Sequence, residues 1–321
     1  MTFHVLVPDN VDKKAIDILE AAEGVTVQAP GNMSREETLA AIPTADAMII
    51  RSSTKADKDL LEAATNLKVI ARAGVGVDNV DLAVATERGI VVMNTPDGNT
   101  ISTAEFTFGL MLALARHIPV SYGYMTEGRW DRKQFKGVEL RDKTLGIVGF
   151  GRIGRAVAKR ALAFEMSVIT ADPYISADVV EDFGARLVDL DTLYAESDFI
   201  TLHTIITDDT REMINAESIA KMKPGVRIIN AARGALINDA DLAAAIKEGR
   251  VAGAAVDVYA SEPPPPEHPL VGLHGVIHTP HLAASTGDAQ IQVGVDAAYE
   301  VIDALTKQEY INVVNPDVLD D

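Results

Sequence analysis

Short apolar runs alternate with amphipathic segments along the first hundred residues. The runs predict strands at residues 4–7, 25–28, 47–50, 69–72 and 91–94. The segments between them have helical spacing of apolar residues, as at 13–20, 35–42 and 58–64. Alternating strands and helices are typical of a parallel sheet that is covered by helices. This part of the chain therefore predicts a doubly wound α/β domain of the flavodoxin-like kind.

The same alternation starts again at Thr144. Further strands are predicted at residues 145–148, 168–170, 199–202, 226–229, 254–256 and 276–278. The predicted fold class is α/β, with two doubly wound parallel-sheet domains in tandem.

Two helices are expected to join these domains. Residues 100–116 are apolar on every side, which indicates burial between domains or subunits; Ser102 and Glu105 resemble a capping box, and Pro119 is expected to end the helix. A second helix at about 284–305 returns the chain. We therefore expect a substrate-binding domain from residues 1–98 plus 283–321, and a cofactor domain at 99–282. Ligands of open α/β sheets bind at the carboxyl ends of strands, so the active site is expected in the cleft between the domains.

A glycine turn opens the second domain. Gly149, Gly151 and Gly154 follow a buried strand with G-x-G-x-x-G spacing, and the next strand ends at Asp172. In a Rossmann domain these glycines allow a tight turn, close approach of a pyrophosphate and close helix packing. The carboxylate would accept hydrogen bonds from both ribose hydroxyls and repel a 2′-phosphate, which predicts NAD rather than NADP. The complete strand–helix–strand context favours this interpretation over a plain turn.

The charge of the chain narrows the class of ligand. Its 321 residues include 29 basic and 47 acidic ones, a net charge of −18, and no Cys. Such acidity is expected to disfavour nucleic acid and anionic membranes as partners, and any anionic substrate needs local Arg or Lys. The absence of Cys excludes disulfides and thiol chemistry and is typical of a cytoplasmic protein. The N-terminus has no basic and apolar signal segment.

Candidate catalytic residues follow three later strands. Arg233 follows the strand at 226–229, Glu262 follows the strand at 254–256, and His281 follows the strand at 276–278. A hydroxy-acid dehydrogenase needs an acid/base, a partner for the imidazolium and a bidentate carboxylate ligand, and these three types match. Taken singly, a surface Arg, a helix-capping His and a Glu before a proline loop are equally good interpretations. Their placement on one sheet edge favours hydride-transfer chemistry.

These motifs resemble the D-isomer-specific 2-hydroxyacid dehydrogenases, and within that family the D-3-phosphoglycerate dehydrogenase branch. The resemblance covers nearly the whole chain and is carried by residues 51–55, 72–81, 92–96, 149–154, 230–234, 257–264 and 280–286. It implies that Arg233, Glu262 and His281 are catalytic, with His281 as the acid/base. It also implies that NAD is bound by Arg152, Ile153, Thr204, Ala231, Asp257 and Ala283 besides the glycines and Asp172, with Asp257 near the nicotinamide amide. No metal is implied.

The substrate implied by the resemblance is D-3-phosphoglycerate, oxidised to 3-phosphohydroxypyruvate on the route to serine. Candidate substrate residues are Arg51, Ser52, Arg72, Gly74 and Arg132, the last reaching the partner subunit of a homodimer or tetramer. Long members of the family carry further C-terminal domains, often serine-binding, so a chain that ends at residue 321 is expected to lack feedback through one. Shorter relatives that reduce glyoxylate or hydroxypyruvate, and NAD-sensing corepressors of the same fold, are the alternatives.

Overall fold

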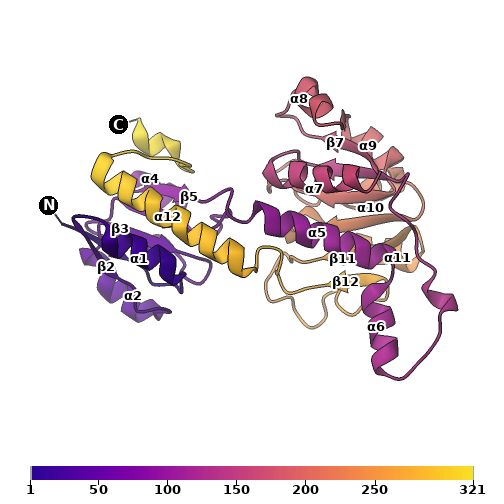
Figure 1. Ribbon diagram of the computed structural model, residues 1–321, viewed down its shortest axis with the longest axis horizontal. Coiled ribbons are helices and arrows are strands. Elements are labelled where there is room, and N and C mark those ends of the chain that lie inside the picture. The colour runs from indigo at the N-terminus through magenta and orange to yellow at the C-terminus, as the bar shows by residue number, and fades with distance from the viewer. Residues whose placement is uncertain (1, 321) are drawn as a thin grey trace. The chain divides into compact units, whose positions relative to one another are not determined.

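The computed structural model describes residues 2–320. The chain forms two compact units, one of Met1–Asn99 with Ser285–Asp321 and one of Thr100–Ala284. We call them the first and the second unit and describe each separately (Figure 1). Both are α/β units built on parallel sheets, as the alternating apolar runs predict.

The first unit has a five-stranded parallel sheet in the order β2-β1-β3-β4-β5. Its strands are β1 (Phe3–Leu6), β2 (Val25–Gln28), β3 (Ala47–Ile50), β4 (Val69–Arg72) and β5 (Val91–Asn94). Its α-helices are α1 (Lys13–Ala21), α2 (Arg35–Ala41), α3 (Lys58–Ala63), α4 (Leu82–Glu87) and α12 (Gly287–Lys307). Short 3-10 turns, η1 (Ile42–Thr44) and η4 (Pro316–Leu319), complete it.

Local signals fix where these helices begin. Ser34 and Glu37 form a reciprocal capping box at the start of α2, and Asp57 accepts a hydrogen bond from the Leu60 amide at the start of α3. Strands β3, β4 and β5 are almost wholly buried, while the edge strand β2 is partly exposed. Separate apolar clusters cover the two sides of the sheet. In Figure 1 the yellow α12 runs beside the indigo α1, and the two helices pack together. The last long helix of the chain thus belongs to the unit formed by its first residues.

The second unit has a seven-stranded parallel sheet in the order β12-β11-β10-β9-β6-β7-β8. Its strands are β6 (Thr144–Val148), β7 (Ser167–Ala171), β8 (Arg186–Leu187), β9 (Phe199–Leu202), β10 (Val226–Asn230), β11 (Val251–Val256) and β12 (Val276–His278). Its helices are α5 (Thr100–Ala115), α6 (Ile118–Thr126), α7 (Arg152–Ala163), α8 (Ala177–Asp182), α9 (Leu190–Glu196), α10 (Ala216–Lys221) and α11 (Asp239–Lys247), with 3-10 turns η2 (Lys133–Phe135) and η3 (Gly234–Leu236). The strand order reverses direction at β6, between β9 and β7, which is where such sheets bind ligands.

Two expectations about the helix at 100–116 are wrong. The helix begins at Thr100, so Ser102 lies inside its first turn rather than at the N-cap position. Pro119 lies in the first turn of α6, where its missing N–H has no helical partner to lose, so it begins the next helix. Ile101 on this helix is 56% exposed in the single chain, and burial of the helix between domains or subunits stays a prediction.

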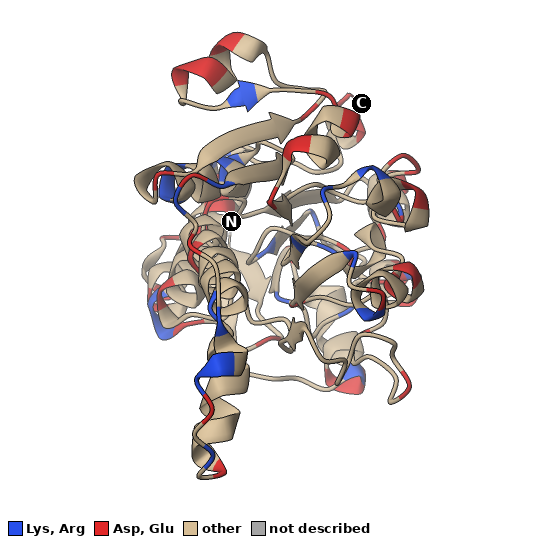
Figure 2. Cartoon of the chain, turned by 90° about the vertical axis from the view of Figure 1, so that its right-hand side faces the viewer, with Lys and Arg blue, Asp and Glu red and all other residues tan. Residues whose placement is uncertain are grey.

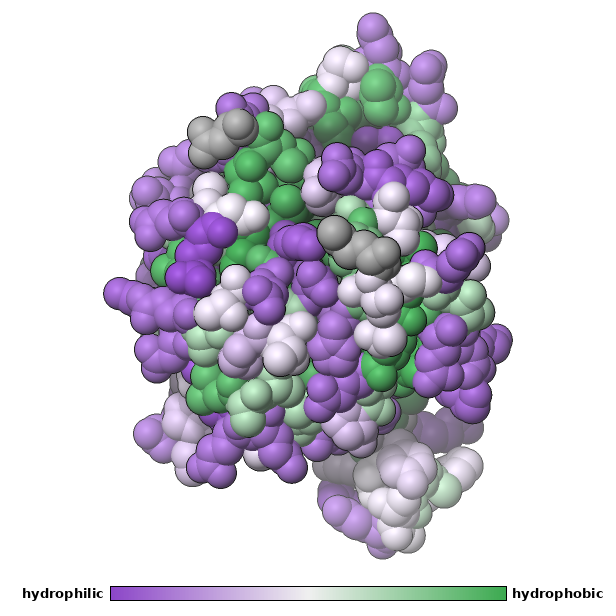
Figure 3. Space-filling model, turned by 90° about the vertical axis from the view of Figure 1, so that its left-hand side faces the viewer, coloured by the Kyte–Doolittle hydropathy of each residue, from purple (hydrophilic) through white to green (hydrophobic). Residues whose placement is uncertain are grey.

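The surface carries both signs of charge. Figure 2 shows Asp and Glu spread over helices and loops, with Lys and Arg between them. On the face in Figure 3, apolar residues reach the surface at several places among hydrophilic ones. Among the described residues, no helix is both long enough and apolar enough to cross a bilayer.

Candidate active site

The glycine turn between β6 and α7 has three glycines with three different surroundings. A Cβ on Gly149 would lie 2.5 Å from the carbonyl oxygen of His203, and one on Gly154 would lie 2.2 Å from that of Gly149. A Cβ on Gly151 would meet nothing within 4 Å. Gly149 also has φ 90°, a conformation that favours glycine. Gly149 and Gly154 are therefore required by the packing of the protein backbone. Gly151, in contrast, leaves open space at the start of α7. An open helix start of this kind is where a pyrophosphate binds in such domains.

Asp172 lies at the end of β7, beside this turn. Its Oδ2 accepts a hydrogen bond from the amide of Phe150 at 2.7 Å, and its Oδ1 accepts one from the amide of Tyr174 at 2.9 Å. These bonds fix the carboxylate next to the glycine turn. Each oxygen has a second lone pair, so the carboxylate can still accept from a pair of ribose hydroxyls.

The side chains of His281 and Glu262 meet. His281 Nδ1 lies 2.7 Å from Glu262 Oε2, and the amide of Tyr259 donates to Glu262 Oε1 at 3.1 Å. Because a carboxylate only accepts, the proton of this contact belongs to His281 Nδ1, and Nε2 is left to exchange protons with a ligand. The two side chains are 53% and 37% exposed, so they are open to a ligand.

Asp257 builds the turn that presents His281. It is fully buried at the end of β11, and its carboxylate accepts hydrogen bonds from Thr279 Oγ1 at 2.5 Å and from the amides of Leu282 and Ala283 at 2.8 Å each. Its carbonyl oxygen accepts from the amide of His281, which has φ 56°. These contacts hold His281 in an uncommon left-handed conformation. The contact of Asp257 with the nicotinamide stays a prediction.

Arg233 lies in a turn organised by Asn230 at the end of β10. Asn230 is buried; its Nδ2 donates to the carbonyl of Arg233 at 2.9 Å, and its Oδ1 accepts from the amide of Ala232 at 3.1 Å. A Cβ on Gly234 would lie 2.0 Å from the carbonyl carbon of Tyr259. The turn that carries Arg233 therefore packs directly on the loop that carries Glu262.

The remaining predicted cofactor residues lie at the same edge of the sheet. Arg152 and Ile153 open α7, and Thr204, Ala231 and Ala283 follow β9, β10 and β12. The sequence interpretation did not single out His203, next to Thr204. Burial lowers the pKa of its imidazole to about 3, so it is neutral, and its Nε2 contacts Thr201 Oγ1 at 3.0 Å. Its place one residue after β9 was the signal available in the sequence.

The predicted substrate residues of the first unit follow two adjacent strands. Arg51 and Ser52 follow β3, while Arg72 ends β4 and Gly74 follows it. Arg51 Nη1 donates to the carbonyl of Asn10 at 3.0 Å, and Arg72 Nη1 donates to that of Ala73 at 3.3 Å. The guanidinium of Arg72 occupies the space where a Cβ on Gly74 would lie.

Arg132 belongs to a different unit from the other predicted substrate residues. It is an exposed residue of the second unit and immediately precedes η2. Its contact with a substrate stays a prediction.

Comparison with known proteins identifies the class. Residues 108–283 match the family model described as D-isomer specific 2-hydroxyacid dehydrogenase, NAD binding domain. The chain belongs to this family, and the matched part is the family's NAD-binding domain. The two-sheet α/β fold is confirmed.

Particular relatives fall into two groups. The D-3-phosphoglycerate dehydrogenase of Archaeoglobus fulgidus is 49% identical over 311 residues, which cover 97% of this chain and 59% of the relative. The hydroxypyruvate reductase of Thermotoga maritima is 46% identical over 305 residues, covering 94% of this chain and 98% of the relative. The chain thus spans somewhat more than half the length of the phosphoglycerate dehydrogenases it matches.

Solved structures share the fold along nearly the whole chain. The TT0316 protein from Thermus thermophilus superimposes with a TM-score of 0.88 at 35% identity, covering 97% of this chain and all of that one. A glyoxylate reductase from Paecilomyes thermophila has a TM-score of 0.87 at 30% identity and covers 98% of each chain.

Proposed function

We propose that the protein oxidises D-3-phosphoglycerate to 3-phosphohydroxypyruvate with NAD, as a step toward serine. The observation that carries the chemistry is the His281–Glu262 contact of 2.7 Å, at the edge of the sheet that also carries the glycine turn. Support for a phosphorylated substrate comes from Arg51 and Arg72 at adjacent strand ends, and from relatives of 46–49% identity that are phosphoglycerate dehydrogenases.

In the proposed reaction His281 is the acid/base. Its Nε2 takes the hydroxyl proton of the substrate, because Nδ1 is held by Glu262, whose negative charge stabilises the imidazolium. Arg233 binds the substrate carboxylate through two parallel hydrogen bonds. Bound NAD supplies the acceptor for the hydride that leaves the substrate carbon. In the reverse direction protonated His281 returns the proton to the carbonyl oxygen.

Replacement of His281 tests the acid/base role. His281→Ala is expected to lower kcat by about 10²-fold or more, which is the usual contribution of a positioned acid/base, while the Kd for NAD stays the same. His274→Ala, which alters an exposed His of the same unit, serves as the control. Turnover of His281→Ala close to the wild-type value would refute the assignment.

Replacement of Arg51 tests the substrate. D-3-phosphoglycerate and D-glycerate differ only in the phosphate. The ratio of their kcat/KM values therefore measures recognition of the phosphate alone. Arg51→Ala is expected to lower kcat/KM about tenfold or more for the first and little for the second, because a charged hydrogen bond is lost only there. An equal effect on both substrates would argue against a phosphate contact at Arg51.

A hydroxypyruvate reductase is the second candidate. The observation that favours it is the 46% identity to the hydroxypyruvate reductase of Thermotoga maritima. Comparison of 3-phosphohydroxypyruvate with hydroxypyruvate as substrates for NADH oxidation separates the candidates. An NAD-sensing protein would bind NAD and turn over neither.

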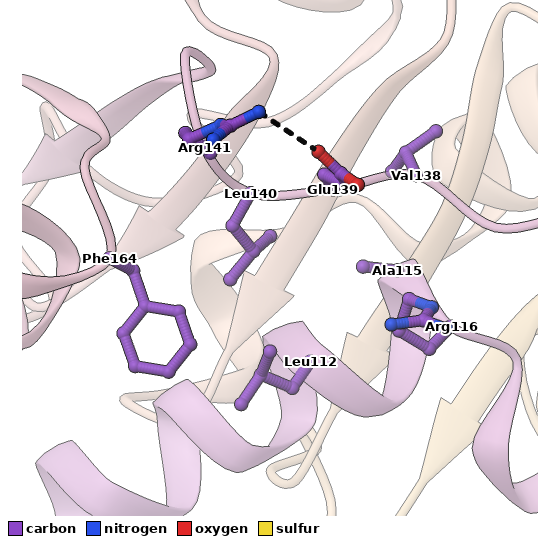
Figure 4. A pocket seen from close by; sticks show the side chains of 8 residues that line it. All are labelled: Leu112, Ala115, Arg116, Val138, Glu139, Leu140, Arg141 and Phe164. Carbon is purple, nitrogen blue, oxygen red and sulfur yellow. Dashed lines mark ion pairs between the residues drawn. The ribbon is translucent and has the colours of Figure 1, made fainter.

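We also propose that the chain self-associates through the second unit. Large apolar side chains are exposed on α5, α6 and the segments after them, with Tyr122 70% and Trp130 76% exposed. A hollow of about 340 Å³ lies at the end of α5, where Leu112, Leu140 and Phe164 line one side (Figure 4). Such a patch is typical of a protein interface, and a second copy of the chain would cover it.

Sedimentation equilibrium tests self-association. Tyr122→Ser is expected to raise the dimer dissociation constant about tenfold or more, as for an aromatic residue central to an interface. Tyr299→Ser removes a tyrosine that is 53% exposed in the first unit and is the control. A wild-type chain that stays monomeric throughout would refute this proposal.

A further inference from the structure

The loop after β3 is exposed, yet it is held from beneath. Residues 51–55 carry the proposed phosphate ligands, and Ser52 and Ser53 are exposed. Within residues 2–320, no acceptor takes the amide N–H of Ser52 or Ser53. Exposed amides, hydroxyls and a guanidinium are the donors that bind a phosphate. A loop of this kind discriminates among ligands only if its backbone is fixed.

Asp9 holds this loop from the end of β1. It is 4% exposed, and its carboxylate accepts hydrogen bonds from the amide of Arg51 at 2.5 Å, from Thr54 Oγ1 at 2.7 Å and from the amide of Thr54 at 3.3 Å. All three donors belong to the loop. The negative charge of Asp9 is thus satisfied by the loop backbone, beneath the surface that a substrate would contact.

Asn79 also holds this loop, by donating hydrogen bonds to its carbonyl groups. Its Nδ2 donates to the carbonyls of Arg51 at 2.8 Å and Thr54 at 2.6 Å, and its own carbonyl accepts from the amide of Ala56. Asn79 closes the loop after β4, which carries Gly74. It therefore ties the loop after β3 to the loop after β4.

The loop after β4 is anchored at its other end as well. Asn94 Nδ2 donates to the carbonyl of Val75 at 2.6 Å, and the amide of Thr95 donates to the carbonyl of Gly74 at 3.0 Å. With both loops anchored, Asn79 fixes the distance between their exposed residues.

We propose that Asp9 and Asn79 are positioning residues that set the spacing of these two loops, and thereby the preference for a phosphorylated over an unphosphorylated 2-hydroxy acid. The inference rests on the proposed function, which assigns the phosphate to the loop after β3. Neither side chain contacts the substrate, and both act by holding the donors that do. The ligand class is a short acid that carries a carboxylate at one end and a phosphate at the other.

The test compares kcat/KM for D-3-phosphoglycerate and D-glycerate across a graded series. Asn79→Ala removes both donors to the loop carbonyls. Thr54→Val removes only the hydroxyl bond to Asp9 and keeps the shape of the side chain, while Thr54→Ser retains that bond. Thr65→Val is the control, because the Thr65 hydroxyl makes a comparable bond to the carbonyl of Pro43, away from the loop.

Asn79→Ala is expected to raise the KM for D-3-phosphoglycerate about tenfold with kcat nearly unchanged, as for the loss of uniform binding. The KM values for D-glycerate and NAD should stay within about twofold, on the same reasoning. Thr54→Val should give a smaller shift in the same direction, Thr54→Ser should recover the wild-type value, and Thr65→Val should match wild type. If Asn79→Ala does not fold, the Thr54 pair decides the question.

The inference would be overturned if every folded variant kept the wild-type preference for D-3-phosphoglycerate over D-glycerate. An equal loss of kcat/KM for both substrates would also overturn it, because that result indicates a merely structural role. A wild-type enzyme without preference for the phosphorylated acid would refute the proposed function and this inference with it. That failure is visible before any variant is made, so the two failures are distinguishable.

Discussion

Glu300 makes the stability of the first unit depend on pH. It lies on α12 with 2% exposure; its Oε1 accepts a hydrogen bond from Asn312 Nδ2 at 2.9 Å. Within the described residues Oε2 is buried without a hydrogen-bond partner. Burial, with a smaller contribution from the negative charge of Asp296, raises the pKa of Glu300 from 4.5 to about 7 against the opposing effect of the Asn312 bond. The folded protein thus keeps this carboxyl group protonated under conditions in which the unfolded chain ionises it.

The sign of the effect follows from proton binding. Between pH 4.5 and about 7 the folded state binds more protons at Glu300 than the unfolded state, so the free energy of unfolding falls as the pH rises. The contribution of Glu300 is fully present below pH 4.5 and fully lost above about pH 7. At about 1.4 kcal/mol per pH unit the total is roughly 3 kcal/mol.

Glu300→Gln removes the titration and keeps the shape and the acceptor for Asn312. From pH 5 to pH 8 wild type is expected to lose roughly 2 to 3 kcal/mol more in free energy of unfolding than the variant does. Calorimetric unfolding at several pH values measures the difference, because other titrating groups contribute equally to both proteins. Glu309→Gln alters an exposed carboxylate just after the same helix and should follow wild type. If wild type and Glu300→Gln lose stability in parallel from pH 5 to pH 8, the reasoning is refuted.

Three further substitutions test the second unit. Gly154→Ala is expected to destabilise it by roughly 2 kcal/mol or more, since the Cβ would lie 2.2 Å from a backbone oxygen; an unchanged Tm would contradict this. Asp172→Ala is expected to raise the Kd for NAD about tenfold, because a charged hydrogen-bond acceptor is lost. The preference for NAD over NADP should therefore become smaller. Titration with both cofactors measures the two Kd values. The added Cβ of Gly234→Ala must displace the backbone at Tyr259. Because small misplacements near reacting groups are costly, kcat is expected to fall about tenfold or more, while NAD still binds.

The sequence predicts the sheets better than the helix ends. The strands at 47–50, 69–72 and 91–94 have the predicted bounds, because each is a short apolar run enclosed by polar or glycine-containing segments. The start of α5 at Thr100 was predicted, but the capping box was not correct, because Ser102 lies inside the first turn. Which side chains satisfy the first amides of a helix depends on the backbone, and composition alone does not determine it.

Burial of individual polar residues was not predictable. Glu300 falls on an amphipathic helix, where an acidic residue normally indicates the solvent face, yet it is buried beneath the segment that carries Asn312. Asp9 likewise resembles an ordinary residue after a strand. Both are buried by contacts with residues distant in the sequence. The pairing of Glu262 with His281 was expected from chemistry, but their geometry depends on the turn that Asp257 holds.

The polar residues at the strand ends divide into two kinds. Asn230 and Asp257 satisfy their side chains largely with backbone amides, carbonyls and a hydroxyl of the protein, so they build turns. The Nε2 of His281 has no such partner among residues 2–320, since its contact with Glu262 uses Nδ1. A carboxylate has about four acceptor positions, and Asp257 has filled three of them. One acceptor position remains, and its use by the nicotinamide amide stays a prediction, because Asp257 is fully buried in the single chain.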